Sequence, residues 1–153
     1  MVKYFGNDVR RINHAMKVYS FAKTIGELET ISDEKFQVLE VAAILHDIGI
    51  KESERKHNSS SGTYQEIEGP PIARELLSEF KLGSEFIDRV CYLIGNHHTY
   101  SNIDNMDFQI LVEADLLVNI FEDSLSEQAI NLLKEKYFKT RSGNSFLECM
   151  YQN

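Results

Sequence analysis

Hydrophobic residues recur along most of the chain at steps of three and four, a pattern that predicts amphipathic helices. In residues 8–26 one helical face carries Ile12, Ala15, Met16, Tyr19 and Ala22. Similar patterns predict helices over residues 33–46, 71–81, 84–96, 106–121 and 126–139. No segment alternates with a period of two for long enough to predict a strand. We therefore expect an all-α fold of about six or more helices, in a single domain over residues 1–153.

Local signals place some of the expected helix ends. "SDEK" puts acidic residues in the first turn of the helix at 33–46, and Gly49 is expected to stop it. Pro71 is expected in the first turn of the third helix, where proline is tolerated. The polar segment "HNSSSGTYQ" (57–65) predicts a mobile loop, read either as an exposed linker or as a loop over a site.

Composition excludes some classes of partner. The chain has 16 basic and 24 acidic residues, for a net charge of −8. This balance argues against binding to nucleic-acid polymers or anionic membranes, although a metal can reverse the local potential for a small anion. The first residues lack the apolar core of a signal peptide, and the two cysteines form no CxxC motif. We expect a cytoplasmic protein without a membrane span.

Asp115 is the most informative single residue. It lies in "FQILVEADLLVNIF" (108–121), which is apolar on almost every side, as a buried central helix is. An unpaired carboxylate buried there costs several kcal/mol. Either a cation lies beside Asp115, and a metal ion is the simplest one, or the carboxylate is hydrated or caps a helix.

Two other segments contain side chains that could bind the same metal ion as Asp115. His14 lies on or beside the apolar face of the first helix, and His46 and Asp47 are adjacent at the end of the second. Taken singly, His14 fits a core histidine and the pair fits an ordinary helix end. Together with Asp115 they form a nitrogen and oxygen ligand set suited to a divalent transition metal. A helix end before Gly49 would let both His46 and Asp47 turn toward one ion.

The order of these residues resembles the HD-domain superfamily of metal-dependent phosphohydrolases. A histidine in the first helix is followed 32 residues later by His-Asp and later by an aspartate. The likeness extends over "RRINHAMKVY", "AAILHDIGI", "EGPPIARELL", "CYLIGNHHT" and "FQILVEADLLVN". It implies an all-α domain in which His14, His46, Asp47 and Asp115 bind one divalent ion (Mn²⁺, Fe²⁺, Co²⁺, Ni²⁺ or Zn²⁺). The ion would activate water against a phosphate ester.

Paired histidines in "NHHTY" raise the question of a second metal. In two-metal relatives such a pair works with an earlier histidine, whose position here is Gln65. Because a neutral amide oxygen is a weak partner for such metals, the resemblance predicts one ion. His97 and His98 are then expected to contact phosphate or hold a water. Their alternative role is a favourable interaction with the negative end of a helix.

Four more charged residues are candidates for the chemistry. Glu66 and Glu68 could act as base or orient the water, or could simply supply negative charge at a helix start. Lys51 and Arg55 follow the His-Asp pair and could stabilise a leaving phosphate, or could be surface residues of a short helix.

Departures from relatives narrow the expected activity. Hydrolases of guanosine tetraphosphate in this superfamily carry an acidic pair where this chain has Ile50-Lys51, and the Gly-Tyr-Pro stretch of the cyclic-dinucleotide phosphodiesterases is absent. We expect a small stand-alone phosphohydrolase whose substrate is a nucleotide or another phosphomonoester. The alternatives are a non-catalytic sensor that binds metal or nucleotide, and a structural metal domain with a closed site. The oligomeric state, including a homodimer, stays open.

Overall fold

The computed structural model describes residues 1–152, which form nine α-helices, one 3-10 helix and no strand. This confirms the all-α expectation. The α-helices are α1 (Val2–Phe5), α2 (Val9–Leu28), α3 (Asp33–Leu45), α4 (Ile50–His57), α5 (Gly62–Ser78), α6 (Ser84–Ile94), α7 (Met106–Glu122), α8 (Glu127–Tyr137) and α9 (Arg141–Tyr151), with the 3-10 helix η1 at Tyr100–Asn102.

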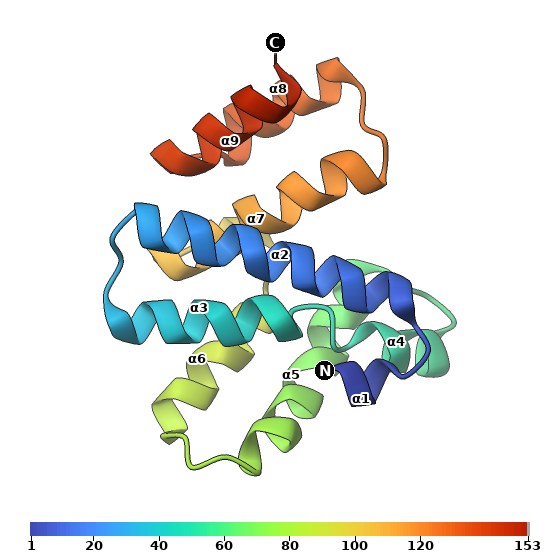
Figure 1. Cartoon of the computed structure of the whole chain (residues 1–153). Coiled ribbons are helices and arrows are strands. Elements are labelled where there is room, and N and C mark those ends of the chain that lie inside the picture. The colour runs from blue at the N-terminus through green and yellow to red at the C-terminus, as the bar shows by residue number, and fades with distance from the viewer. Residues whose placement is uncertain (153) are drawn as a thin grey trace.

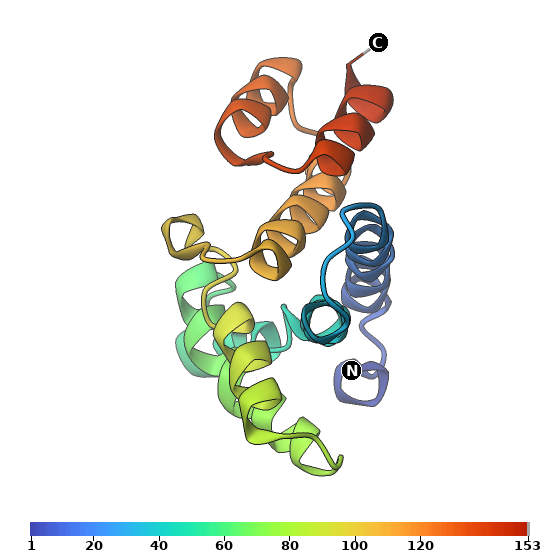
Figure 2. The ribbon, with the colours of Figure 1, turned by 90° about the vertical axis from the view of Figure 1, so that its left-hand side faces the viewer.

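The long helix α2 packs against both α3 and α7 and forms the middle of the molecule (Figure 1). Helices α5 and α6 pack as a pair on one side of α3, and α8 and α9 lie at the other end, beyond α7 (Figure 2). Helix α7 is buried along nearly its whole length, as its continuous apolar sequence predicts. The space enclosed by α2, the end of α3, α6 and α7 is where the candidate ligands meet.

Helix α5 differs most from the sequence prediction. It begins at Gly62 and contains both Pro70 and Pro71, whereas the sequence predicted a start at Pro71. The two prolines cannot donate hydrogen bonds to the carbonyls one turn earlier, yet the helix continues through them because its other bonds and its packing against α4 and α6 remain. The predicted loop over residues 57–65 is therefore shorter in the structure. Helix α4 runs to His57, and only residues 58–61 lie outside a helix.

Three helices were not predicted. Helices α1 and α4 are short, and α4 ("IKESERKH") contains a single apolar residue, Ile50. Helix α9 begins at a capping residue, Thr140, whose hydroxyl accepts a hydrogen bond from the Gly143 amide. Within the described residues, no helix is both long and apolar enough to cross a membrane.

The turn after α3 presses against α5. Here the Ile48 amide bonds to the Leu45 carbonyl and the Ile50 amide to the Asp47 carbonyl. A Cβ atom on Gly49 would lie 2.5 Å from the Gln65 carbonyl oxygen. Gly49 is thus required by the close approach of two backbones, which holds the His46-Asp47 segment in place.

Candidate metal centre

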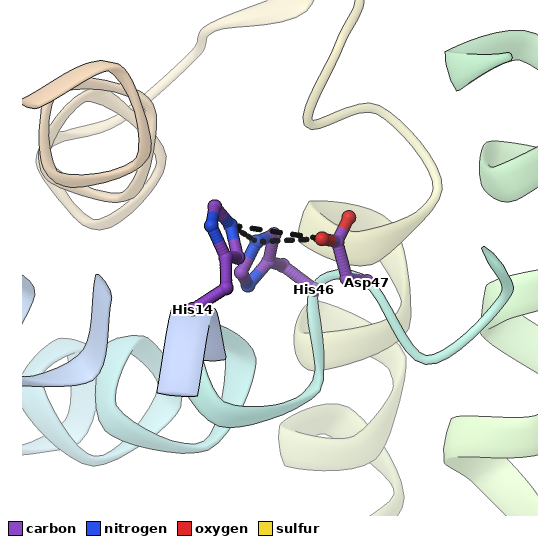
Figure 3. Close-up of side chains that lie close together, drawn as sticks. All are labelled: His14, His46 and Asp47. Carbon is purple, nitrogen blue, oxygen red and sulfur yellow. Dashed lines mark hydrogen bonds and ion pairs between the residues drawn. The ribbon is translucent and has the colours of Figure 1, made fainter. Parts of the chain in front are cut away.

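Three separate elements bring the four predicted metal ligands together. His14 comes from the middle of α2, His46 and Asp47 from the turn after α3, and Asp115 from the buried middle of α7. His14, His46 and Asp115 are buried, and the Asp47 side chain is 18% exposed. Figure 3 shows the rings of His14 and His46 turned toward the carboxylate of Asp47.

The ligand atoms of this cluster face one another closely. The Nε2 atoms of His14 and His46 are 3.2 Å apart, and each lies 3.6 Å from Oδ2 of Asp47. Oδ1 of Asp115 lies 3.2 Å from the His14 Nε2 and 3.6 Å from the His46 Nε2. Each of the two Nε2 atoms therefore lies within 3.6 Å of a carboxylate oxygen of Asp47 and of one of Asp115.

These separations fit the donor set of a divalent metal. Ligands about 2.1 Å from one ion lie about 3.0 Å apart at right angles and about 3.4 Å apart in a tetrahedron. Among the described residues, no lysine or arginine lies within ion-pair distance of Asp47 or Asp115. The two carboxylates thus have only imidazoles as charged partners, and the cluster could hold a divalent cation.

The ring orientations are held from the far side. The His46 Nδ1 lies 2.9 Å from the Ala43 carbonyl oxygen, and the His14 Nδ1 lies 3.1 Å from Oε2 of Glu122. A carbonyl or carboxylate oxygen can only accept, so in both rings Nδ1 donates. Such bonds turn Nε2 toward the metal position.

Charges in the cluster shift the pKa values strongly. Burial alone would lower the pKa of His14, but the hydrogen bond to Asp115 and the nearby Asp47 and Glu122 raise it to about 9. Burial dominates at His46 and lowers its pKa. Burial would raise the pKa of Asp47 and of Asp115, yet the surrounding imidazoles hold both below their usual range. Both carboxylates are therefore ionised at neutral pH.

The paired histidines lie beside this cluster. The His97 Nε2 is 3.5 Å from Oδ1 of Asp47, and ligand atoms of Asp47, His97 and His98 all lie within 4.8 Å of one another. The His97 ring is oriented by its Nδ1, which donates to the Ile94 carbonyl at 2.7 Å, while its buried Nε2 has no hydrogen-bond partner among the described residues. His98 is more exposed, and burial of its ring together with the charge of His97 lowers its pKa to about 4.

Gln65 is anchored through its amide nitrogen. Its Nε2 donates to the Ser60 carbonyl at 2.8 Å, and its buried Oε1 has no hydrogen-bond partner among the described residues. The side chain is thereby tied to the segment that joins α4 to α5.

Glu66 and Glu68 lie within α5, and their oxygens bond elsewhere. Glu66 accepts from the His98 amide and the Thr99 hydroxyl, both at 3.0 Å. Glu68 pairs with Lys56 at 2.7 Å and with His57 at 3.0 Å. The structure places neither as a free base beside the cluster, and it corrects the expectation that they precede the helix start. Glu66 instead fixes the turn that carries the paired histidines.

Lys51 and Arg55 are also not brought to the cluster. Lys51 donates to the Tyr4 carbonyl at 3.2 Å, and Arg55 pairs with Glu52 on its own helix at 2.6 Å. His14 and Asp47 instead open into a cavity of about 360 Å³ whose lining includes Arg10, Arg11, Glu122 and Asn119.

The sequence analysis did not identify Arg10 or Glu122 as site residues, although their spacing from the predicted ligands places them near the site. Arg10 precedes His14 by four residues, and Glu122 follows Asp115 by seven, so each falls on the same helical face as a predicted ligand. Arg11 is held by Asp8 at 2.9 Å and by Glu54 at 2.5 Å.

Comparison with known proteins agrees with this geometry. The family model of the HD domain matches residues 11–136, which include all four candidate ligands. A crystal structure of a predicted HD superfamily hydrolase from an uncultured Thermotogales bacterium is similar, with a TM-score of 0.69 and 23% identity over 97% of this chain and 79% of that one. No curated protein matches the chain significantly. With the family model covering most of its length, the chain belongs to the HD-domain family.

Proposed function

We propose that the protein is a metal-dependent phosphohydrolase that cleaves a small phosphomonoester, such as a nucleotide. The observation that supports this most is the convergence of two imidazoles and two carboxylates, of which His14 and Asp47 line a cavity. A divalent ion bound there would act as a Lewis acid toward a phosphoryl oxygen and would lower the pKa of a water.

The cavity favours a catalytic over a structural site. Structural metal sites are closed by protein ligands, whereas catalytic ones leave positions for water and substrate. Here the Asp47 side chain is partly exposed, and both it and His14 line the cavity. A volume of about 360 Å³ lies at the small end of the range for ligand pockets, which favours a small substrate over a polymer.

Arg10 in the cavity wall and His97 beside Asp47 can bind phosphate. Arg10 supplies positive charge to a dianionic ester, whereas Arg11 is already paired with Asp8 and Glu54. The unpartnered Nε2 of His97 faces Asp47 and can donate to a phosphate oxygen or a water, since Asp47 raises the pKa of His97 despite its burial. The Asp47 carboxylate has one oxygen toward each side, so it links the metal position to His97.

We further propose one ion per chain, because the third imidazole of a second site is replaced by Gln65. Metal analysis of the purified protein checks this proposal, and two ions per chain would contradict it. His97→Ala should lower turnover while the ion held by His14, His46, Asp47 and Asp115 stays bound.

The deciding experiment is a panel of phosphate esters assayed with added Mn²⁺, Co²⁺ and Ni²⁺. We expect hydrolysis of a small phosphomonoester that is abolished by chelation and by Asp115→Asn. The matched control is Glu148→Gln, which removes an exposed carboxylate on α9 that pairs with Lys134 and does not line the cavity. Metal binding without turnover on any ester would favour the second candidate, a non-catalytic sensor.

A further inference from the structure

Both ring nitrogens of His14 meet carboxylates from one helix. Asp115 faces Nε2 at 3.2 Å, and Glu122 faces Nδ1 at 3.1 Å. The two acids are seven residues apart on α7, which is two helical turns, so they project from the same face. The single helix α7 therefore holds the imidazole of α2 from both sides.

His14 is supported differently from the other two histidines of the site. His46 and His97 each direct Nδ1 to a main-chain carbonyl three residues earlier, Ala43 and Ile94 respectively. Those bonds are local and neutral. His14, in the middle of a regular helix, finds its carbonyls already used by the helix, and its Nδ1 instead meets a charged group 108 residues away.

The Glu122 carboxylate is itself fixed in place. Its Oε2 faces His14, while its Oε1 pairs with the ammonium group of Lys17, which lies three residues after His14 on α2. The Glu122 side chain is only 15% exposed, so water competes weakly for these contacts. Each carboxylate oxygen thus has its own partner on α2.

We propose that Glu122 is a positioning residue of the metal centre: it fixes the Nδ1–H tautomer of His14, points Nε2 at the metal position and makes that nitrogen a stronger ligand. Carboxylates hydrogen-bonded to metal-ligating histidines have this effect in other proteins, where their loss weakens metal binding about 10–100-fold. The inference rests on the metal binding of the proposed function and not on turnover.

The test measures Zn²⁺ affinity by competition with a chromophoric chelator, using the full chain. Glu122→Ala should weaken binding about 10–100-fold. Glu122→Gln keeps an acceptor oxygen but loses the charge, so its loss should be smaller. Asp123→Asn is the matched control, because it removes the next carboxylate in the chain, which lines the same cavity without contacting the His14 ring. It should change the affinity less than about twofold, since only long-range charge is lost.

A second readout separates positioning from general structure. In the Zn²⁺-loaded wild type, NMR should show the His14 Nδ1 proton far downfield, as expected for a bond to a carboxylate, and the signal should move upfield in Glu122→Gln and be lost to exchange in Glu122→Ala. Wild-type affinity in Glu122→Ala, or an unmoved proton signal, would overturn the inference. Failure of the wild type itself to bind any divalent metal would instead refute the proposed function.

Discussion

Metal binding should release a proton from His14. In the metal-free protein the pKa of His14 is raised to about 9, because its hydrogen bond to Asp115 and the charges of Asp47 and Glu122 outweigh its burial. A histidine binds a metal only as the neutral ring, so the ion must displace that proton. The His14 side chain is 10% exposed, and solvent therefore screens these charges only weakly.

The size of the pH effect on metal affinity follows from the difference between the pKa of His14 and the pH of the experiment. At pH 7, about two units below the pKa, roughly 1% of His14 is neutral, so the affinity should be about 100-fold weaker than above pH 9, a difference of about 2.7 kcal/mol. Between pH 6.5 and 8.5 the logarithm of the affinity should rise with a slope near one.

Calorimetric titration of the chelator-treated protein with Mn²⁺ measures this directly. Repeating the titration at pH 7 in two buffers of different ionisation enthalpy counts the protons, and we expect about one per ion. A ¹⁵N NMR titration of the metal-free protein assigns that proton to His14. His98→Ala is the control, because the pKa of His98 is lowered to about 4 and its ring is already neutral at pH 7. An affinity independent of pH, with no proton released, would refute the reasoning.

Further outcomes test other parts of the structure. The folded-state pKa of His14 lies above its ordinary value of 6.5, so the stability that His14 contributes is complete below about pH 6.5 and is lost as the pH rises through about 9. Thermal melting with chelator present should therefore show Tm falling from pH 7 to 9.5. Gly49→Ala should lower the free energy of unfolding, measured in urea, by about 1–3 kcal/mol and should weaken metal binding, since a Cβ atom would lie 2.5 Å from the Gln65 carbonyl oxygen. The control is Gly83→Ala at the cap of α6, where nothing lies within 4 Å, and it should lower the free energy of unfolding by less than about 1 kcal/mol. Gln65→His should raise the metal content measured by elemental analysis from one ion toward two, and an unchanged content would show that the new ring cannot reach the site. Glu113→Ala should cost more than about 2 kcal/mol in urea, because buried donors lose their acceptor, while metal affinity measured by chelator competition stays unchanged.

Much of the fold and the ligand set could be predicted from the sequence, because both depend on local pattern. The period of the apolar residues on α2, α3, α6, α7 and α8 requires only neighbours along the chain. Asp115 could be identified by its apolar surroundings, whereas His14, His46 and Asp47 became candidates only as a set with Asp115, in an order that resembles the HD-domain superfamily. The structure brings these residues together, whereas their binding of metal remains a prediction for the experiments above.

A buried carboxylate was not sufficient evidence by itself, however. Glu113 lies two residues before Asp115 on the same helix and is fully buried. It accepts hydrogen bonds from the Lys139 amide at 2.6 Å and the Thr140 amide at 2.8 Å, so the loop between α8 and α9 satisfies it. Nothing in "LVEADLLV" distinguishes the two acids. Only the packing of distant segments decides which carboxylate faces protein donors and which faces imidazoles.

The charged residues around the site were predicted least well, for the same physical reason. Lys51 and Arg55 follow the His-Asp pair directly, yet their long, flexible side chains bond to Tyr4 and Glu52. Arg10 and Glu122 reach the cavity because α2 and α7 pack side by side. Helix periodicity is set by each residue's neighbours in the chain and is therefore visible in the sequence. The partner of a charged side chain is set by which helices meet, and that only the tertiary structure decides.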